Sequence, residues 1–578
     1  MQQQQQQTLL LSPLVALNSH SSAKIKPIIR QYCREKVLDE LSSMRSSKSH
    51  VKNLKKVKFY QSDTRYPPWG PSLRSFINTV KSQDSLSRLH YQLFSKFQLQ
   101  NAFFSTKLRG LSTLSSLKLE VREESRNATY IQVFMKILAS FKNLTHLDVQ
   151  FFVYNVKRSP AIEDFFESLV LLRRLTSLSL HIHMGRNALG DELDILSSYL
   201  SRLTKLRKLT LSFDKSMETD DKNLMTILPS VLSKLTNLAH ISLSLAGKTI
   251  QAPALLKLFM LFGTMRALSS IDINLAFSNI VNENPTEVLT ECLACLDSSL
   301  IRKLSFHLYQ NTNSESLNKM AEALERFTSL GALCLNLRGC KVITDENIMK
   351  ISSMVSRLAS LGSLNLTFPP LGIDTLFDRI VSAIASLQSL KSLGLAFDCL
   401  NKISGSQIQQ LFSSLKPSLQ SLNIDIHEPK SVVEDSITYE KLGENLKELA
   451  LLRNLYLNFG RNNVIKNAEI ESITDAIKEL PSLSSLELRL EGLENIDESA
   501  IGKIAEALRS LPSLSSVNLH LSQCKKLKEK EDGLLSLFNV LKEKASIQDI
   551  SLWISYCKLN QEQTSELWKL KDIYLVWC

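Results

Sequence analysis

The amino-acid sequence predicts an α/β solenoid, built from about eighteen repeats that each contribute one short strand and one helix. Three observations lead to this fold class. A unit of the form Leu-x-x-Leu-x-Leu-x-apolar recurs along the chain, and successive copies start roughly 28 to 33 residues apart. Between the copies, apolar residues follow the spacing of an amphipathic helix. Glycine (17) and proline (15) are scarce in 578 residues, which leaves little room for linkers between separate domains.

The repeated unit is visible over most of the chain. The earliest copy begins at Leu54, and the last ends at Trp577. Clear copies occupy residues 175–182, 206–213, 330–337, 361–368, 390–397 and 483–490. A chance match would not keep one spacing over such a length. Each copy ends in alternating apolar and polar residues, which is the period of a half-buried strand.

The segments between strands carry helix-start signals. Thr344 and Asp497 each stand before an acidic residue and an apolar stripe. Side-chain oxygens at such positions accept hydrogen bonds from free N–H groups, and acids suit the positive end of the helix dipole. The stripe after Thr344 consists of Ile348, Ile351, Met354, Val355 and Leu358. Neither the strand nor the helix of a unit buries its apolar face alone, so the units are expected to stack.

With these repeats the chain resembles the leucine-rich-repeat family, and its unit length is similar to that of the ribonuclease-inhibitor-like class. The resemblance implies a curved horseshoe, with a parallel sheet on the concave side and helices on the convex side. It covers about nine tenths of the chain in periodicity. In that family an Asn or Cys three residues after the last strand leucine ties the turn to the neighbouring repeat. Matching residues are Asn311, Cys340, Asn462, Cys524 and Cys557, whereas Ser216, Leu371, Leu400, Pro429 and Leu493 depart from the pattern.

Three segments make up the expected domain organisation. Residues 1–22 form a disordered tail that contains Gln and Ser, residues 23–50 a basic helical cap, and residues 51–578 the repeats, of which the last is short. Residues 24–58 carry eleven basic and three acidic side chains, so +8 of the net charge of +12 lies there. The basic patch comprises Lys48, Lys52, Lys55, Lys56 and Lys58. It is interpreted either as a solvated face of the cap or as a site for nucleic acid, acidic protein or a membrane surface.

The nine cysteines favour a reducing compartment, because they are odd in number and mostly lie inside apolar patterns. No run is long and apolar enough for a transmembrane helix. We therefore expect a cytoplasmic protein. Mitochondrial targeting stays open, since Lys24, Lys26, Arg30 and Arg34 precede the first acid. The chain finishes on a strand, whose open edge is covered either by a helix around residues 561–570 or by another chain, including a second copy.

The sequence offers little for catalysis, so no enzyme activity, cofactor or metal is expected. It contains no phosphate-binding or dinucleotide-binding glycine loop and no His-Glu-x-x-His. Cys292 and Cys295 lie on a helix among leucines, where they are expected to pack rather than to bind zinc. Histidines at polar strand positions should face the concave side, but in different columns of the sheet. These are His90, His146, His181, His240, His307 and His520.

The polar strand positions predict a protein-binding surface. Small neutral side chains dominate there, with scattered charges of both signs, and a row of Lys or Arg that would neutralise phosphates is missing. Nucleic acid is therefore not expected on the concave face. Interface energy concentrates in Trp, Tyr and Arg, and these residues gather in the last third of the sheet. The candidate site consists of Tyr456, Glu487, Arg489, His520, Trp553 and Tyr574.

The function that follows is a non-catalytic scaffold or adaptor that binds another protein on the concave face. One alternative is a structural subunit of a large cytoskeletal or ribonucleoprotein assembly. Another is a GTPase activator that resembles the Ran-directed leucine-rich-repeat proteins, although the acidic tail of that class is missing. A third is a substrate receptor of a ubiquitin ligase, for which residues 1–50 show no F-box-like pattern. The fold does not distinguish among these functions.

Overall fold

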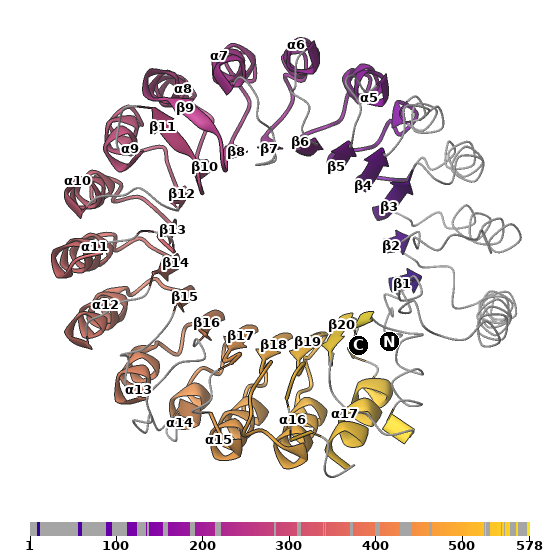
Figure 1. Cartoon of the computed structure of the whole chain (residues 1–578), viewed down its shortest axis with the longest axis vertical. Helices are drawn as coiled ribbons and strands as arrows, with labels where there is room; N and C mark the ends of the chain where they lie inside the picture. Colours follow the sequence, from indigo (N-terminus) through magenta and orange to yellow (C-terminus); the bar gives the residue numbers. More distant parts are fainter. Residues whose placement is uncertain are drawn as a thin grey trace, which may run out of the picture. The chain divides into compact units, whose positions relative to one another are not determined.

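The computed structural model of the chain describes most of the repeats. The described residues are 8–11, 56–59, 88–94, 113–123, 135, 138–153, 160–184, 191–213, 221–281, 285–308, 314–338, 340, 343–369, 374–398, 405–427, 442–461, 465–524, 526–527, 532–544, 546–547, 549–554, 562–563 and 575–577. They belong to two compact units, Met1–Leu245 and Ala246–Cys578. In each unit the strands lie on the inner side of the sheet's curve and the helices on its outer side (Figure 1).

The described part of unit 1 consists of parallel strands and of helices that alternate with them from β5 onward. Its elements are β1 (Thr8–Leu11), β2 (Lys56–Phe59), β3 (Arg88–Phe94), β4 (Ser116–Glu123), β5 (His146–Val153), α5 (Pro160–Val170), β6 (Ser177–Met184), α6 (Asp191–Leu200), β7 (Lys208–Phe213), α7 (Asp221–Leu232) and β8 (His240–Ser244). Each strand pairs in parallel with the next one in the chain.

Unit 2 continues the same alternation. Its first part contains β9 (Thr249–Gln251), α8 (Ala252–Thr264), β10 (Ser270–Asn274), β11 (Asn279–Val281), α9 (Pro285–Ala294), β12 (Lys303–His307), α10 (Ser314–Leu324), β13 (Ala332–Asn336), α11 (Asp345–Arg357), β14 (Ser363–Phe368), α12 (Asp374–Ser386) and β15 (Ser392–Asp398). Its second part contains α13 (Gly405–Ser414), β16 (Ser421–His427), α14 (Leu442–Lys447), β17 (Asn454–Asn458), α15 (Asn467–Lys478), β18 (Ser485–Arg489), α16 (Glu498–Ser510), β19 (Ser516–His520), α17 (Asp532–Glu543), β20 (Asp549–Trp553) and β21 (Leu575–Trp577).

The pairing register reproduces the spacing of the sequence repeat. Paired residues are 28 to 33 apart along the chain from β2 to β8, and again from β10 to β20. Short strands β9 and β11 form a separate parallel pair. Because every strand is parallel to its neighbours and is followed by a crossover segment, the fold is a leucine-rich-repeat solenoid, as the resemblance implied.

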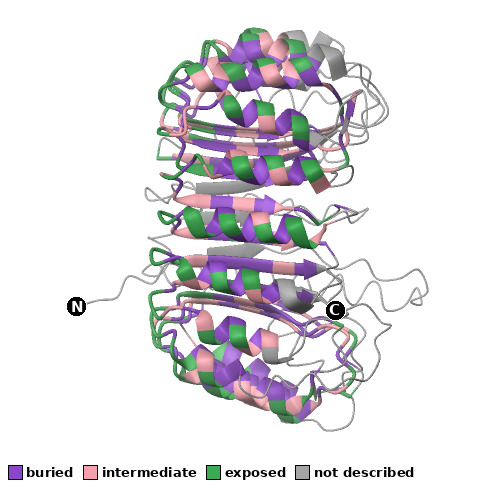
Figure 2. Ribbon diagram, turned by 90° about the vertical axis from the view of Figure 1, so that its left-hand side faces the viewer, coloured by how far each residue is buried: buried purple, intermediate pink, exposed green. Residues whose placement is uncertain are grey.

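The core lies between the sheet and the helices. On β7, Leu209, Leu211 and Phe213 are buried while Lys208 is exposed, which is the predicted alternation. Helices show a buried stripe toward the sheet and exposed residues on the opposite side (Figure 2). On α11 the buried stripe includes Ile348, Ile351, Met354 and Val355, as predicted.

The predicted helix caps are confirmed. Thr344 forms a capping box with Asn347, whose backbone N–H donates to Thr344 Oγ1 at 3.4 Å. Asp497 Oδ1 accepts from the backbone N–H of Ser499 at 2.9 Å. These contacts satisfy N–H groups that have no partner inside the helix.

The turns after the strands share one backbone conformation. The third residue after β8, β10, β17, β18 and β19 has a positive φ: 71° at Gly247 and Gly492, 59° at Phe277 and Arg461, and 63° at Gln523. This left-handed region suits glycine, so the three larger residues are held there by the repeat. The predicted tie at Cys524 is confirmed, since its thiol donates to the carbonyl oxygen of Leu490 in the preceding repeat at 3.1 Å. Asn311, Asn462 and Cys557 lie outside the described residues.

The two ends differ from the sequence expectations in part. Within the expected disordered tail, Thr8–Leu11 forms β1 and pairs with β2, because an apolar run is available to extend the sheet edge. The expected cap, residues 23–50, lies outside the described residues. At the other end, Leu575 pairs with Ser551 and Trp577 with Trp553. The sequence repeat aligns the last copy on Ile573, Leu575 and Trp577, which would place Leu575 and Trp577 in line with the core leucines. The pairing instead aligns Val576 with Leu552, so this alignment is wrong by one residue.

Candidate protein-binding surface

The parallel register places the predicted site residues in two adjacent columns of unit 2. The first column runs from β16 to β20 through Asn423, Tyr456, Glu487, Asn518 and Ser551. The second runs through Asp425, Asn458, Arg489, His520 and Trp553. Neighbouring strands lie about 4.8 Å apart, so side chains in one column touch across the strands. Five of the six predicted residues therefore share one surface. Tyr574 lies outside the described residues.

Arg489 lies at the centre of this surface. Its Nε donates to Glu487 Oε1 at 2.8 Å, two positions back on the same strand. Its guanidinium carbon lies 5.4 Å from the centre of the Tyr456 ring on β17. A cation over an aromatic face is attracted by the ring's negative face. Both contacts fix the guanidinium in place, while 37% of the Arg489 side chain stays exposed to a partner.

Burial and a carboxylate govern the ionisation of Tyr456. Partial burial, followed by the nearby Asp425 carboxylate, raises the pKa of the phenol to about 12. The hydroxyl therefore keeps its proton at neutral pH and is available as a hydrogen-bond donor.

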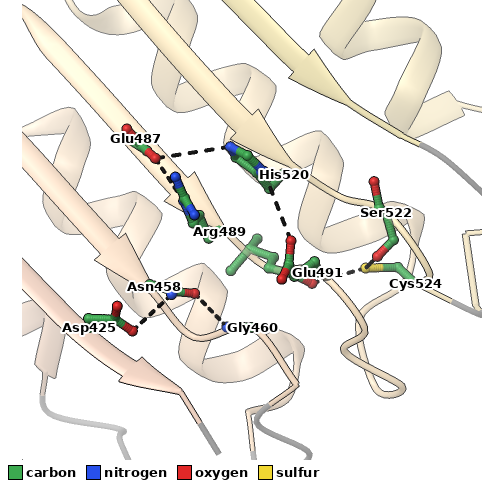
Figure 3. A network of polar contacts seen from close by, with 10 residues as sticks. Asp425, Asn458, Gly460, Glu487, Arg489, Glu491, His520, Ser522 and Cys524 are labelled. Atoms are coloured by element: carbon green, nitrogen blue, oxygen red, sulfur yellow. Dashed lines mark hydrogen bonds and ion pairs between the residues drawn. The ribbon is translucent and has the colours of Figure 1, made fainter. Parts of the chain in front are cut away.

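His520 is more covered than the sequence suggested. Its residue is only 8% exposed, and its ring stacks on Trp553 of β20 with centroids 5.2 Å apart and an interplanar angle of 10°. The ring nitrogens lie 4.0 Å from Glu487 Oε1 and 4.0 Å from Glu491 Oε2 (Figure 3). The buried Nε2 has no hydrogen-bond partner. His520 thus stacks against Trp553 from the neighbouring strand, and little of its own side chain is exposed to a partner.

The pKa of His520 is lowered, first by burial and then by the Arg489 cation. Glu487 and Glu491 oppose this shift without reversing it. The folded protein therefore binds a proton at His520 at lower pH than the unfolded chain does. Between the folded pKa and the unfolded value of about 6.5, the unfolded state holds more protons, so the stability falls as the pH falls.

The expected result is a thermal midpoint that drops less in His520→Gln than in the wild type when the pH is lowered from about 7.5 to about 5.5. Circular dichroism melts at both pH values measure this difference. His146→Gln is the control, because His146 is exposed at the start of β5. The same drop in His520→Gln and wild type would contradict the assignment of this pH dependence to His520.

A second polar contact continues the surface toward β16. Asn458 Nδ2 donates to Asp425 Oδ1 at 2.8 Å, and Asn458 Oδ1 accepts from the backbone N–H of Gly460 at 3.0 Å (Figure 3). Asn458 therefore links the sheet to the turn that follows it. The hydrogen bond of Asp425 to Asn458 and the contact of Glu491 with His520 were not predicted from the sequence. The repeat could have identified both residues. Asp425 lies in the same column as Arg489, and Glu491 follows two residues after it.

The concave face of unit 1 has polar contacts of the same kind. Lys118 Nζ lies 3.3 Å from Asp148 Oδ2, and His181 Nε2 lies 4.0 Å from Asp148 Oδ1. Near Asp148, Ser179 Oγ lies 2.9 Å from His181 Nε2, and further along the same strands the Phe152 ring stacks on His183 with centroids 4.5 Å apart.

The remaining predicted residues are only partly within the described chain. Lys56 and Lys58 belong to β2, while Lys48, Lys52 and Lys55 lie outside the described residues. Cys292 is buried on α9, and burial raises the pKa of its thiol. Among the residues that the structure describes, no group of three or more His, Cys, Asp or Glu side chains is placed to hold a metal ion. Within the same residues, none of the helices combines the length and apolar character that a membrane span requires.

Comparison with known proteins identifies similar folds. No family model and no curated protein matches the sequence. The chain is similar to the leucine-rich repeat-containing protein LegL7 from Legionella pneumophila, with 18% identity and a TM-score of 0.33 over 62% of this chain and 96% of that one.

Two structures of complexes are also similar. A chain of the yeast Rad7 and Elc1 complex matches at 12% identity and a TM-score of 0.34, over 94% of this chain and 97% of that one. A chain of the Drosophila Toll and Spatzle complex matches at 14% identity and a TM-score of 0.28, over 84% of this chain and 60% of that one. At these identities the likeness concerns the fold alone.

Proposed function

We propose that this leucine-rich-repeat chain is a non-catalytic scaffold or adaptor that holds another protein on the concave face of unit 2. The main support for the proposal is that Tyr456, Arg489 and Trp553 lie close together on β17, β18 and β20 and are each partly exposed. Tyr456 and Arg489 contact each other, and Trp553 stacks on His520. Partly exposed Tyr, Trp and Arg side chains that are already held in one rotamer lose little entropy when a partner binds.

The charges around these residues favour a protein over a nucleic acid. Glu487 and Glu491 place carboxylates near Arg489, and Asp425 adds a third carboxylate two strands away on β16, so the surface carries both signs. Phosphate groups would be repelled by these carboxylates. A protein with mixed polar and apolar side chains fits such a surface.

The cytoplasm is the compartment that we propose. Within the described residues, Cys292, Cys295, Cys334, Cys340 and Cys524 form no disulfide, and three of them are buried. Buried cysteines outside disulfides in a long chain are typical of reducing compartments.

The double variant Trp553→Ala with Arg489→Ala tests the proposed surface. It removes one ring and the central cation, so the recovery of a specific partner should fall at least about tenfold. Affinity capture of the tagged full chain, with quantitative mass spectrometry of the bound proteins, measures the loss. A shortened chain that lacks residues 1–50, run in parallel, identifies any partner that depends on the expected cap instead.

The matched control carries the same kinds of change on the helical side. Met349→Ala with Arg509→Ala removes one large apolar side chain and one cation, both exposed, from α11 and α16. Thermal melts confirm that both variants fold. Partners that bind the wild type and both folded variants equally would contradict the proposal, whereas partners lost only from the concave-face variant support it.

A further inference from the structure

A second charged surface lies on unit 1, at the edge of the sheet where the strands begin. The turns that precede β5, β6, β7 and β8 stack on one another at the edge where these strands begin. The backbone N–H of Thr176 donates to Thr145 O at 3.0 Å, that of Arg207 to Thr176 O at 2.8 Å, and that of Ala239 to Arg207 O at 2.8 Å. Residues far apart in the sequence thereby form one continuous rim.

This rim is basic throughout. The four turns, residues 138–146, 170–177, 200–208 and 232–240, contain no Asp or Glu. Their basic side chains are all exposed, and we call them the basic rim: Lys142, Arg173, Arg174, Arg202, Lys205, Arg207, Lys208 and Lys234. Exposed histidines, His146 and His240, begin two of the strands. Arg174 donates to Asn143 Oδ1 at 2.7 Å, which joins two neighbouring turns of the rim without neutralising the charge.

The excess of positive charge in the basic rim is not found in every turn between a helix and the next strand. In unit 2 some of the equivalent turns contain acids, namely Asp297, Glu325, Glu448 and Glu479, whereas others, such as residues 357–363 and 386–392, contain none. Arg357 at the end of α11 is paired with Glu325 at 2.6 Å. Turns at this position in the repeat can therefore contain acidic residues. The lack of Asp and Glu in the four turns of the basic rim is thus not required by the fold.

The composition of the basic rim fits a phosphate backbone. Lys and Arg release counterions when they neutralise phosphates, and Ser, Thr and Asn add hydrogen bonds to phosphate oxygens. Thr204, Thr236 and Asn237 are exposed between the cations. The one Phe, Tyr or Trp of the four turns, Phe141, is buried, and the exposed rings are the imidazoles of His146 and His240, too few to stack on a run of bases. Leu171 is the large apolar side chain exposed there, too little for a membrane anchor or a protein hot spot.

We propose that the basic rim of unit 1 binds the phosphate backbone of nucleic acid without sequence preference. The basic rim shares no residue with the candidate surface of unit 2 or with the basic patch of Lys48, Lys52, Lys55, Lys56 and Lys58. The row of cations follows the stacking direction of the repeats, and adjacent strands are spaced by about 4.8 Å. A polyanion that follows the rim would therefore contact several turns at once.

The test compares two full-chain variants that each lose four positive charges. The rim variant carries Arg173→Gln, Lys205→Gln, Lys208→Gln and Lys234→Gln. The control variant carries Lys303→Gln, Arg326→Gln, Lys391→Gln and Arg453→Gln, four exposed residues of the equivalent turns in unit 2. Fluorescence anisotropy with a labelled mixed-sequence RNA and a duplex DNA, over salt concentrations of about 50 to 200 mM, measures binding.

The rim variant should bind RNA at least about tenfold more weakly than the wild type, with a salt slope smaller by about 3, since each single-strand phosphate contact contributes roughly 0.7. The control should stay close to the wild type in both quantities. Equal losses in the two variants would show an effect of net charge and overturn the proposal. Absence of RNA and DNA binding would overturn it as well, and binding of polyglutamate or anionic vesicles instead would assign the rim to those partners.

Discussion

Replacing Asn347 by leucine is expected to lower the free energy of unfolding by about 2 to 4 kcal/mol. Asn347 is fully buried near the start of α11. Its Nδ2 donates to Ser314 O and to Asn318 Oδ1, both at 2.7 Å, and its Oδ1 accepts from the backbone N–H of Thr344 at 2.9 Å. Leucine fills the same space but leaves these buried groups without their partners, and each such group costs roughly 1 to 3 kcal/mol.

Chemical denaturation followed by circular dichroism measures the loss. Asn423→Leu is the matched control, because Asn423 is exposed on β16 and the same exchange there should change stability by less than about 0.5 kcal/mol. Asn347→Asp keeps the acceptor but replaces the Nδ2 donor by an oxygen that faces Ser314 O and Asn318 Oδ1, so it should also destabilise. Equal unfolding midpoints for Asn347→Leu and Asn423→Leu would contradict this account of the helix start.

The sequence predicted the parts of the fold that depend on local periodicity. Leu209 and Leu211 are buried because strand alternation alone decides which side of the sheet they occupy. Thr344 and Asp497 cap helices because the cap is made within three residues. Asn347 was not identified, since its partners on α10 are about thirty residues away and only the stacking of two repeats brings them together.

The candidate surface was predicted in position but not in detail. Tyr456, Arg489 and Trp553 share one surface because the repeat fixes their register. The burial of His520 depends on how the Trp553 ring packs, which periodicity does not determine. At the last strand, the run Tyr574 to Trp577 is apolar at every position, so it has no alternation from which a register can be chosen.

The charge distribution shows the clearest difference between sequence and structure. The positive run near Lys48 is visible in the sequence because its residues lie close together along the chain. The eight cations of the basic rim are spread from Lys142 to Lys234, with acids of the intervening helices between them. Only the stacking of the turns separates these cations from the acids and gathers them at one edge of the sheet.

The second large change in stability is expected at Gly533, and Gly502 in the adjacent helix is its control. Gly533 lies in the first turn of α17, where an added Cβ would meet the backbone oxygen of Glu498 well inside van der Waals contact and would lie 2.7 Å from Glu498 Oε2. That carboxylate also accepts from the backbone N–H of Leu534 at 2.8 Å. Because the obstacle is backbone, α16 and α17 have to separate to accommodate alanine. Overpacking of this kind costs about 1 to 3 kcal/mol, occasionally more.

Gly533→Ala should therefore be destabilising, since the steric cost exceeds the roughly 0.5 to 1 kcal/mol that alanine contributes as a better helix former. Gly502, in the middle of α16, has open space around its Cβ position, so Gly502→Ala should be stabilising by that amount. Denaturant titrations of the two variants against the wild type give opposite shifts of the midpoint if α17 packs on Glu498 as described. A gain of stability in both variants would mean that the two helices have room to move apart, because helix propensity alone would then decide both results.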